Sequence, residues 1–218
     1  MSNHVILYGE TLWESPYVLT VYVALREKGL AFETRTLDLG SGAQHAPEFR
    51  DHSITGKVPT LVHDGFWLSE SLAIVEYLEE VFAPPHHPAV LPRDLKERAR
   101  ARQVMSFLRS DFAQLRRERP TTSIFFEQQQ ANHPLSHQAQ AEADKLFRVA
   151  RTLVPEGATH MGSTWCVADV DLALMLMRLV ENDDPVPASL AAYARAQWAR
   201  PSVHAFATQP RPIAPPVK

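Results

Sequence analysis

Cysteine is nearly absent from this chain: Cys166 is the only one, so no intrachain disulfide can form. Such a composition is typical of a protein from a reducing compartment. No apolar run approaches the roughly 20 residues that a membrane-spanning helix requires, and we expect no membrane partner. The first residues have the pattern of a short strand rather than of a signal peptide. These absences together predict a cytoplasmic location.

A strong charge of either sign is also missing. The formal net charge is −3, which gives no strong attraction to nucleic acid or anionic lipid, and we expect no nucleic-acid partner. Hydrophobic residues make up 45% and charged residues 22% of the 218 residues, values typical of a globular protein. A chain of this length can form one large domain or two small ones with a substantial core.

Proline is concentrated in one internal segment, residues 84–92, where regular structure is disfavoured. Proline has no backbone N–H to donate, and it restricts the conformation of the residue before it. We interpret 84–92 as a linker between a first domain, residues 1–83, and a second domain, residues 93–218. The tail from Pro210 is also rich in proline, and we expect no regular structure there.

The first domain mixes strand and helix patterns in the order β-α-β, a loop, then β-β-α. Strands are predicted over 5–8, 32–39, 60–63 and 66–68, and helices over 15–28 and from 69 to about 82. Ser15 and Pro16 suit the start of a helix, while Asp64 and Gly65 suit a tight hairpin. A strand–helix–strand unit of this length favours parallel pairing. This order predicts an α/β thioredoxin-like domain (βαβ-ββα).

The second domain is almost entirely helical in pattern. A long helix is predicted from Asp94 to Arg119, with apolar residues on one face and Pro120 after its end. Further helices are predicted over 136–153, 168–177 and 187–200, with a short one near Val203. The segment 168–177 is apolar nearly all round, which is typical of a helix at the centre of a bundle. We therefore expect an all-α helical bundle.

Three short motifs follow one another in the first domain. They are Trp13-Glu14-Ser15-Pro16-Tyr17-Val18-Leu19, Gly56-Lys57-Val58-Pro59-Thr60-Leu61 and Leu68-Ser69-Glu70-Ser71. These motifs precede a proline-rich linker and a helical half. Together they resemble the cytosolic glutathione S-transferase family, particularly a bacterial member of its serine-type (theta/tau/zeta-like) classes. The resemblance extends to about Arg200. It implies the two-domain glutathione S-transferase architecture, with glutathione as co-substrate on the first domain.

The resemblance also implies an activity. Ser15 is expected to stabilise the glutathione thiolate for attack on a small-molecule electrophile or hydroperoxide, in a homodimer whose helical domain contributes the second-substrate site. A free thiol has a pKa of about 8.5, and lowering it by about two units requires roughly 2.7 kcal/mol. A hydroxyl donor at a helix N-terminus favours a nearby anion. Without the other motifs, Ser15 would be interpreted as a helix cap only.

Val58, Glu70 and Ser71 are expected to bind glutathione by the same resemblance. In this family the bond before Pro59 is cis, and Val58 pairs through its backbone with the cysteinyl backbone of glutathione. Ser71 would bind the γ-glutamyl carboxylate through its hydroxyl and amide at a helix N-terminus, and Glu70 would accept from the γ-glutamyl ammonium. The alternatives are a strand that simply begins with proline and an acidic helix start.

The carboxylate of the glycine moiety requires a cation. Lys57 is adjacent to Val58, and His45 falls near where related serine-type members carry a basic residue; Gln44 competes with His45 for this role. Residues 53–55 replace the Asn-Pro that family members often carry before this motif. The glycine end of the site is therefore where this sequence departs most from the family.

Asp169, Cys166 and Tyr8 are interpreted as structural. The buried helix of the family usually opens with a Ser/Thr-x-x-Asp box, and here Cys166 stands in place of the hydroxyl residue. Asp169 can still accept backbone donors, and Cys166 is expected to be a buried small hydrophobe rather than a nucleophile. Tyr8 lies within a strand pattern, which favours a packing role.

Arg109 and Arg116 are seven residues apart and so share one helix face. They would line the second-substrate cleft or, more in keeping with helical charge runs, face water or a second subunit.

His133 and His137 are four apart, but Pro134 disfavours a helical metal site, and we expect no metal.

Three functional alternatives stay open at this stage. Glutathione peroxidase or isomerase activity could be the main reaction of the same site. A reductase of the cysteine-type classes would need a thiol where this chain has Ser15. A non-catalytic member would bind glutathione or regulate a partner without turnover.

Overall fold

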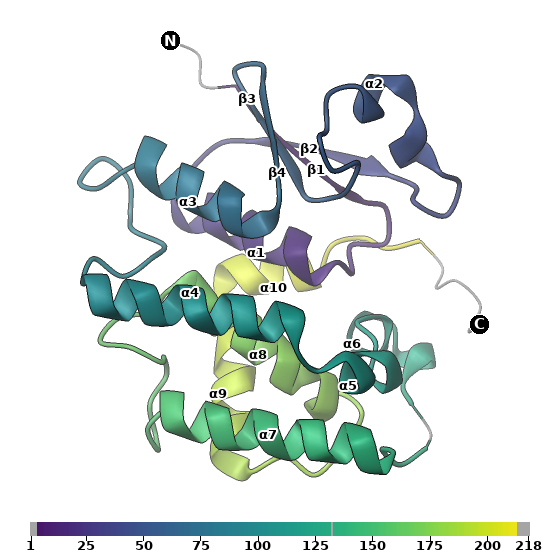
Figure 1. Ribbon diagram of the computed structural model, residues 1–218, viewed down its shortest axis with the longest axis vertical. Helices are drawn as coiled ribbons and strands as arrows, with labels where there is room; N and C mark the ends of the chain where they lie inside the picture. The colour runs from purple at the N-terminus through teal and green to yellow at the C-terminus, as the bar shows by residue number, and fades with distance from the viewer. Residues whose placement is uncertain (1–3, 132, 213–218) are drawn as a thin grey trace. The chain divides into compact units, whose positions relative to one another are not determined.

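The computed structural model describes residues 4–131 and 133–212 of the chain (Figure 1). The chain forms two compact units. One runs from the N-terminus to Val90 and includes the segment that starts at Ala205, and the other runs from Leu91 to His204. Within the described ranges, no helix has both the length and the apolar character needed to cross a bilayer. Most of the tail predicted from Pro210 lies outside these ranges.

A four-stranded mixed sheet is the centre of the first unit. Its strands are β1 (Val5–Glu10), β2 (Glu33–Leu37), β3 (Thr60–His63) and β4 (Phe66–Ser69), in the order β2-β1-β3-β4. β1 is parallel to β2, and the β1–β3 and β3–β4 pairs are antiparallel. Asp64 and Gly65 form the β3–β4 turn with φ values of 48° and 87°, which is the geometry expected of such a turn. The predicted thioredoxin-like order is confirmed.

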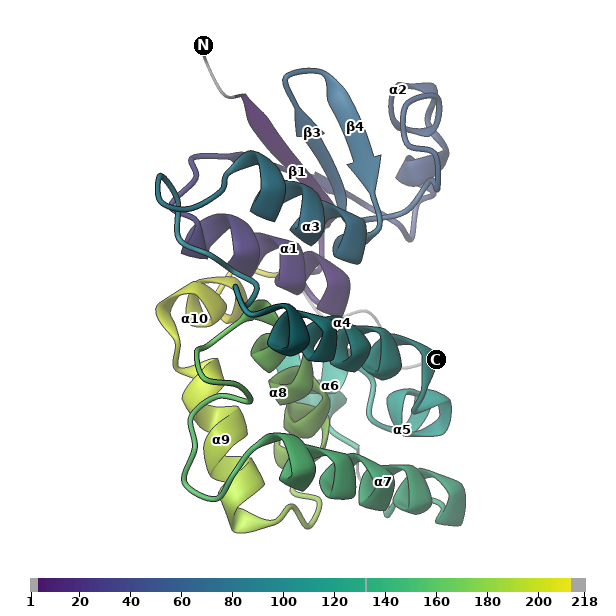
Figure 2. The same ribbon diagram turned by 60° about the vertical axis from the view of Figure 1, so that its left-hand side comes forward.

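Two helices pack together on the sheet. Helices α1 (Pro16–Glu27) and α3 (Ser71–Val81) lie side by side (Figure 2). Their inner faces and the central strands contribute fully buried apolar side chains, among them Leu7, Leu25, Leu61, Ile74 and Leu78. Between β2 and β3 the chain forms a short 3-10 turn, η1 (Ala43–His45), and helix α2 (Pro47–Arg50), a region that the sequence suggested only as loop.

Helix α3 begins later than the predicted start at Ser69. Ser69 is the last residue of β4 and pairs with Thr60 in the ladder, so its backbone belongs to the strand. Glu70 takes the cap position instead, with φ 72° and ψ 112°. A non-glycine residue at such a φ is uncommon, and strained backbone of this kind is enriched at functional sites.

A buried ion pair connects the C-terminal ends of α1 and α3. The Lys28 ammonium lies 2.8 Å from Glu79 Oε2 and donates to the carbonyl oxygens of Phe82 and Pro88. Glu79 accepts in turn from the Val90 amide at 2.9 Å. Because Lys28 and Glu79 are both almost fully buried, these contacts fix the chain that follows α3 to the first unit.

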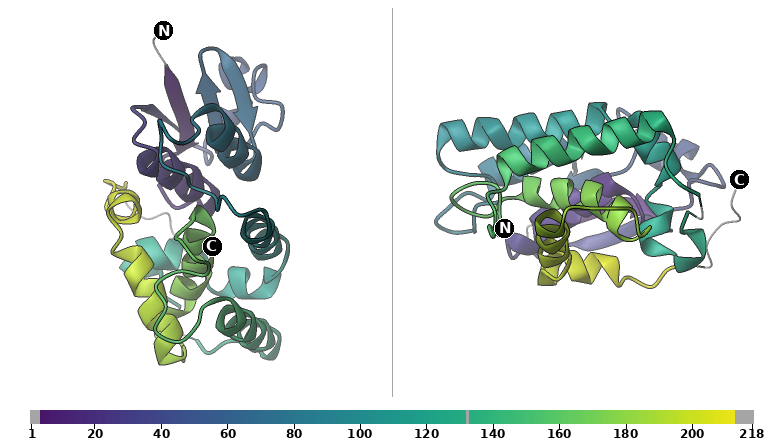
Figure 3. Two further views of the ribbon diagram at one scale, coloured as in Figure 1. Left: turned by 90° about the vertical axis from the view of Figure 1, so that its left-hand side faces the viewer. Right: turned by 90° about the horizontal axis from the view of Figure 1, so that it is seen from below.

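The second unit is a bundle of helices. They are α4 (Leu95–Ser110), α5 (Ala113–Glu118), α6 (Thr122–Phe125), α7 (His137–Leu153), α8 (Val167–Val180) and α9 (Ala188–Trp198), with the 3-10 turn η2 (Glu127–Gln129). α10 (Pro201–Ala207) crosses the boundary between the units. Every residue of α8 is buried, and its apolar side chains join those of α4, α7 and α9 in one core. Figure 3 shows the ribbon of the helices from two further directions. The predicted central helix is confirmed.

The predicted continuous helix over 94–119 is wrong, because the chain breaks after Ser110. Phe112 adopts a left-handed conformation with φ 62°. Its side chain is 1% exposed, and its ring lies 5.0 Å from that of Phe107. Burying a phenylalanine contributes about 1.5–3 kcal/mol, which offsets the roughly 1–2 kcal/mol cost of the left-handed backbone. No glycine or proline marks the break in the sequence.

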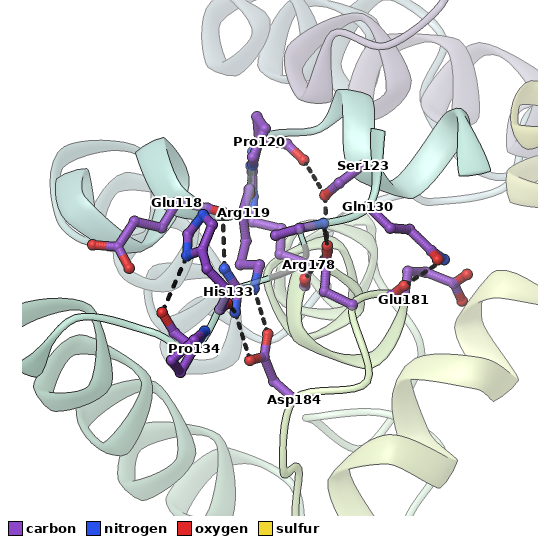
Figure 4. Close-up of polar contacts among 12 residues, drawn as sticks. Glu118, Arg119, Pro120, Ser123, Gln130, His133, Pro134, Arg178, Glu181 and Asp184 are labelled. Carbon is purple, nitrogen blue, oxygen red and sulfur yellow. Dashed lines mark hydrogen bonds and ion pairs between the residues drawn. The ribbon is translucent and has the colours of Figure 1, made fainter. Parts of the chain in front are cut away.

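Arg119 organises the turns at one end of the bundle (Figure 4). Its guanidinium donates to both carboxylate oxygens of Asp184, at 2.6 and 2.8 Å, and to the carbonyl oxygen of His133. Arg178 donates to the carbonyl oxygen of Arg119 at 2.7 Å. These bonds connect the chain after α5, the chain before α7 and the C-terminal end of α8.

Candidate functional site

The segments that carry the predicted site residues start or end at one end of the sheet. Glu10 lies opposite Leu37 in the parallel β1–β2 pair, so the loops that follow both strands start there. Tyr8 lies opposite Thr60, and Thr60 opposite Ser69, which brings the chain before β3 and the chain after β4 to the same end. The four loops that meet there span residues 11–15, 38–46, 51–59 and 70.

Ser15 is the N-cap of α1, as predicted. Its Oγ accepts from the Val18 amide at 3.3 Å, and Pro16 occupies the first helical position. A hydroxyl that accepts one hydrogen bond can still donate its own hydrogen to a ligand. The unpaired amides and the dipole of a helix N-terminus favour an anion at the same place. The catalytic role of Ser15 stays a prediction.

Glu10 shapes the loop that carries Ser15. One oxygen of its carboxylate accepts from the amides of Glu14 and Ser15, the latter at 2.8 Å, while the side chain is 5% exposed. Burial raises the pKa of Glu10 above its ordinary value, and the amide hydrogen bonds oppose that rise. The sequence reasoning missed this residue; a carboxylate at the end of β1, directly before the motif, was the available signal.

Val58 and Pro59 lie between the loop and β3. The bond that joins them is cis, as the family resemblance implied. Thr60 donates from its hydroxyl to the carbonyl oxygen of Lys57 at 2.8 Å, which holds the turn before the strand. Among the described residues, neither the backbone N–H nor the backbone C=O of Val58 has a hydrogen-bond partner.

Glu70 and Ser71 are at the N-terminus of α3. Glu70 is exposed, and its carbonyl oxygen accepts from the Ile74 amide at 2.9 Å. Ser71 is the first helical residue and is 5% exposed. The N-termini of α1 and α3 therefore both open at the sheet end where the four loops meet, and each favours a negatively charged group.

The two candidate cations for the glycine end are exposed. His45 ends η1, and its ring Nε2 lies 3.2 Å from the side-chain nitrogen of Gln44, the residue that competes with it. Lys57 lies in the loop before Val58. Both belong to segments that start or end at this end of the sheet.

The residues interpreted as structural have structural contacts. Asp169 accepts from the amides of Cys166 and Met161 and from the hydroxyl of Tyr193. Burial raises the pKa of Cys166 to about 12, so its thiol is not a nucleophile at neutral pH. Tyr8 stacks on Trp67 at 5.2 Å.

Arg109 and Arg116 are engaged within the helical unit. Arg109 pairs with Asp171, and Arg116 donates to the carbonyl oxygens of Leu108 and Arg109 at the end of α4. These contacts tie α4 to α5 and α8.

In the part of the chain that the structure describes, no group of three His, Cys, Asp or Glu side chains could hold a metal ion.

Two family models match the chain. The one described as "Glutathione S-transferase, C-terminal domain" matches residues 94–210, more than half of the chain, and "Glutathione S-transferase, N-terminal domain" matches residues 14–81. Among curated relatives, glutathione S-transferase 1 of Dianthus caryophyllus is 42% identical over 95 residues, which are 44% of this chain and 42% of that protein. Maleylacetoacetate isomerase of Dictyostelium discoideum is 36% identical over 115 residues, 52% of this chain and 50% of that protein.

The chain thus spans half or less of the length of these two curated relatives. A solved structure is similar over nearly the whole chain: a glutathione transferase homolog from Burkholderia with bound glutathione, 40% identical, with a TM-score of 0.77. That match covers 95% of this chain and 98% of the other. With both domain models matched in order, the chain belongs to the glutathione S-transferase family.

Proposed function

We propose that the protein is an enzyme with glutathione S-transferase activity. The observation that carries this proposal is the convergence of four loops and two helix N-termini at one end of the sheet. A thiolate and a carboxylate of one ligand could each lie at a helix N-terminus. Family membership and the glutathione bound in the Burkholderia structure support glutathione as the co-substrate.

Ser15 would donate a hydrogen bond to the glutathione sulfur and stabilise the thiolate, while the thiol proton passes to water. Lowering the thiol pKa by about two units corresponds to roughly 2.7 kcal/mol. With an electrophilic carbon, a sulfur lone pair forms the new bond and the leaving group departs with its electron pair. With a hydroperoxide, the sulfur attacks the terminal oxygen, the O–O bond breaks, and the alkoxide leaves and takes up a proton to become the alcohol. A second glutathione then attacks the sulfur of the resulting sulfenic acid, which gives the disulfide and releases water.

The binding roles follow from position. Val58 would pair with the cysteinyl backbone through its N–H and C=O, and Ser71 would bind the γ-glutamyl carboxylate. Glu70 would accept from the γ-glutamyl ammonium; its exposed side chain on an unusual backbone conformation supports this role. Lys57 or His45 would meet the glycine carboxylate. No metal takes part in this proposal.

We also propose that the protein acts in the cytoplasm as a homodimer, with residues 1–83 binding glutathione and residues 93–218 contributing the second-substrate site. Membership of the glutathione S-transferase family supports the dimer. Light scattering on the purified protein would give twice the mass of one chain. The mass of a single chain would contradict the dimer.

The test combines binding with turnover. Calorimetry is expected to detect glutathione binding, and assays with an aryl halide and with cumene hydroperoxide decide which reaction dominates. Ser15→Ala should reduce turnover at least tenfold with little loss of glutathione affinity. Binding without turnover would favour a non-catalytic member, and undetectable binding would overturn the proposal. Unchanged turnover in Ser15→Ala would remove Ser15 from the mechanism.

A further inference from the structure

The loop that carries Ser15 is held from the far end of the chain. The segment from Ala205 onward, which includes the end of α10 and is yellow in Figure 1, belongs to the first unit, and Arg211 in it donates to the carbonyl oxygen of Trp13 at 2.8 Å. Trp13 and Arg211 are separated by 198 positions in the sequence. Trp13 is two residues before Ser15.

Trp13 needs such support because its backbone is unfavourable. Its φ is 51°, and a bulky residue in the left-handed region persists only where its surroundings fix it. The Trp13 side chain is 9% exposed, and its ring packs edge-on against Tyr22 at 5.9 Å and Phe206 at 5.5 Å. Phe206 precedes Arg211 in the same C-terminal segment. Both the ring and the carbonyl group of Trp13 are therefore held by this segment.

The guanidinium of Arg211 is itself fixed in place. It donates to three carbonyl oxygens of its own segment, those of Phe206, Ala207 and Gln209, at 3.1, 2.6 and 3.0 Å. The planar guanidinium therefore links these three carbonyl oxygens to the carbonyl oxygen of Trp13. A lysine ammonium, a compact point charge on a flexible stem, cannot reproduce this geometry.

Charge is the second contribution of Arg211. Glu10 and Glu14 flank Ser15, both have pKa values raised by burial, and Arg211 opposes that rise in both. A carboxylate beside the N-terminus of α1 disfavours a thiolate there, because like charges repel. The guanidinium offsets this repulsion.

We propose that Arg211 is a positioning residue for thiolate formation: it holds loop 11–15, and with it Ser15, in the conformation that stabilises the glutathione sulfur. The proposal rests on the proposed function for its catalytic consequence, but the holding of the loop is independent of catalysis. Two measurements separate the two parts.

The first measurement is hydrogen exchange in the full-length protein. Arg211→Ala is expected to speed exchange of the Glu14 and Ser15 amides at least tenfold. Gln209→Ala is the matched control, because Gln209 bonds the Tyr22 hydroxyl and Ala205 from the same segment and has no bond to the loop. Unchanged exchange in Arg211→Ala, or equal acceleration in both variants, would overturn the proposal.

The second measurement is the pH dependence of kcat/KM for the electrophile, with the enzyme saturated with glutathione. In Arg211→Ala the profile should shift to higher pH by at least half a unit, with a smaller change in the KM for glutathione; Arg211→Lys, which keeps the charge, should shift it less. A profile that superimposes on wild type, while Ser15→Ala shifts it, would overturn the proposal. If Ser15→Ala also leaves the profile unchanged, the proposed function fails, and exchange alone then decides whether Arg211 holds the loop.

Discussion

Arg119 in the helical unit and Glu10 in the first unit are buried in different ways. In the helical unit, Arg119 is 1% exposed, and it forms a bidentate pair with Asp184 and bonds to neighbouring carbonyl oxygens. In the first unit, Glu10 has one carboxylate oxygen hydrogen-bonded, while the other, Oε2, is buried without a partner among the described residues. A buried charge whose polar atoms are all paired rigidifies the fold, whereas a partly paired one is costly to bury.

The largest stability effect is expected at Arg119. Arg119→Ala leaves the Asp184 carboxylate and the His133 carbonyl group without their donor, and breaking a buried pair from one side costs about 3–5 kcal/mol. Urea denaturation should show this loss in the free energy of unfolding. If the variant does not fold, Asp184→Asn gives a milder version of the same test. A loss below about 1 kcal/mol in either variant would mean that this network is not a main support of the bundle.

A smaller loss of stability is expected when a serine that caps a helix is replaced, and each unit has one such serine. Ser136 caps α7 through the Ala139 amide at 3.2 Å, much as Ser15 caps α1. Ser136→Ala should lower the free energy of unfolding by about 1 kcal/mol and leave transferase kinetics unchanged. Ser15→Ala should show a similar loss of stability together with the loss of turnover. Equal kinetic losses in both variants would mean that Ser15 acts only through helix stability.

The smallest effect concerns pH. The pKa of Glu10 is raised in the folded protein, so the folded state binds its proton more tightly than the unfolded state does. Glu10 therefore lowers stability progressively as the pH rises above the ordinary carboxyl value of 4.5. Glu10→Gln keeps an acceptor oxygen and should fall less in stability than wild type over that rise, as measured by urea denaturation at several pH values. A steeper fall in the variant would contradict the burial of an ionisable group at this position.

Local signals in the sequence predicted much of this structure. Ser15 and Ser136 are strong N-caps, Asp64-Gly65 specifies a tight turn, and the apolar segment of α8 demands burial. Each of these features depends on a few neighbouring residues. The parallel pairing of β1 with β2 was also predicted, from the length of the strand–helix–strand unit.

The features that sequence reasoning missed depend on distant contacts. The helix break at Phe112 follows from the burial of its ring, and the pairing of Ser69 with Thr60 moved the cap of α3 to Glu70. Arg211 contacts the Ser15 loop across 198 positions, which no local pattern indicates. Glu10 lies only five residues before Ser15, but its role depends on the burial of its carboxylate. The motifs therefore located the site, while the residues that hold it became visible only in the fold.

The central claim is that Ser15 stabilises a thiolate. The most direct measurement is a titration of glutathione bound to the enzyme, followed by thiolate absorbance, in wild type and in Ser15→Ala. The account predicts a wild-type thiol pKa about two units below the free value of about 8.5 and a clear rise toward that value in Ser15→Ala. Equal pKa values in the two proteins would contradict it.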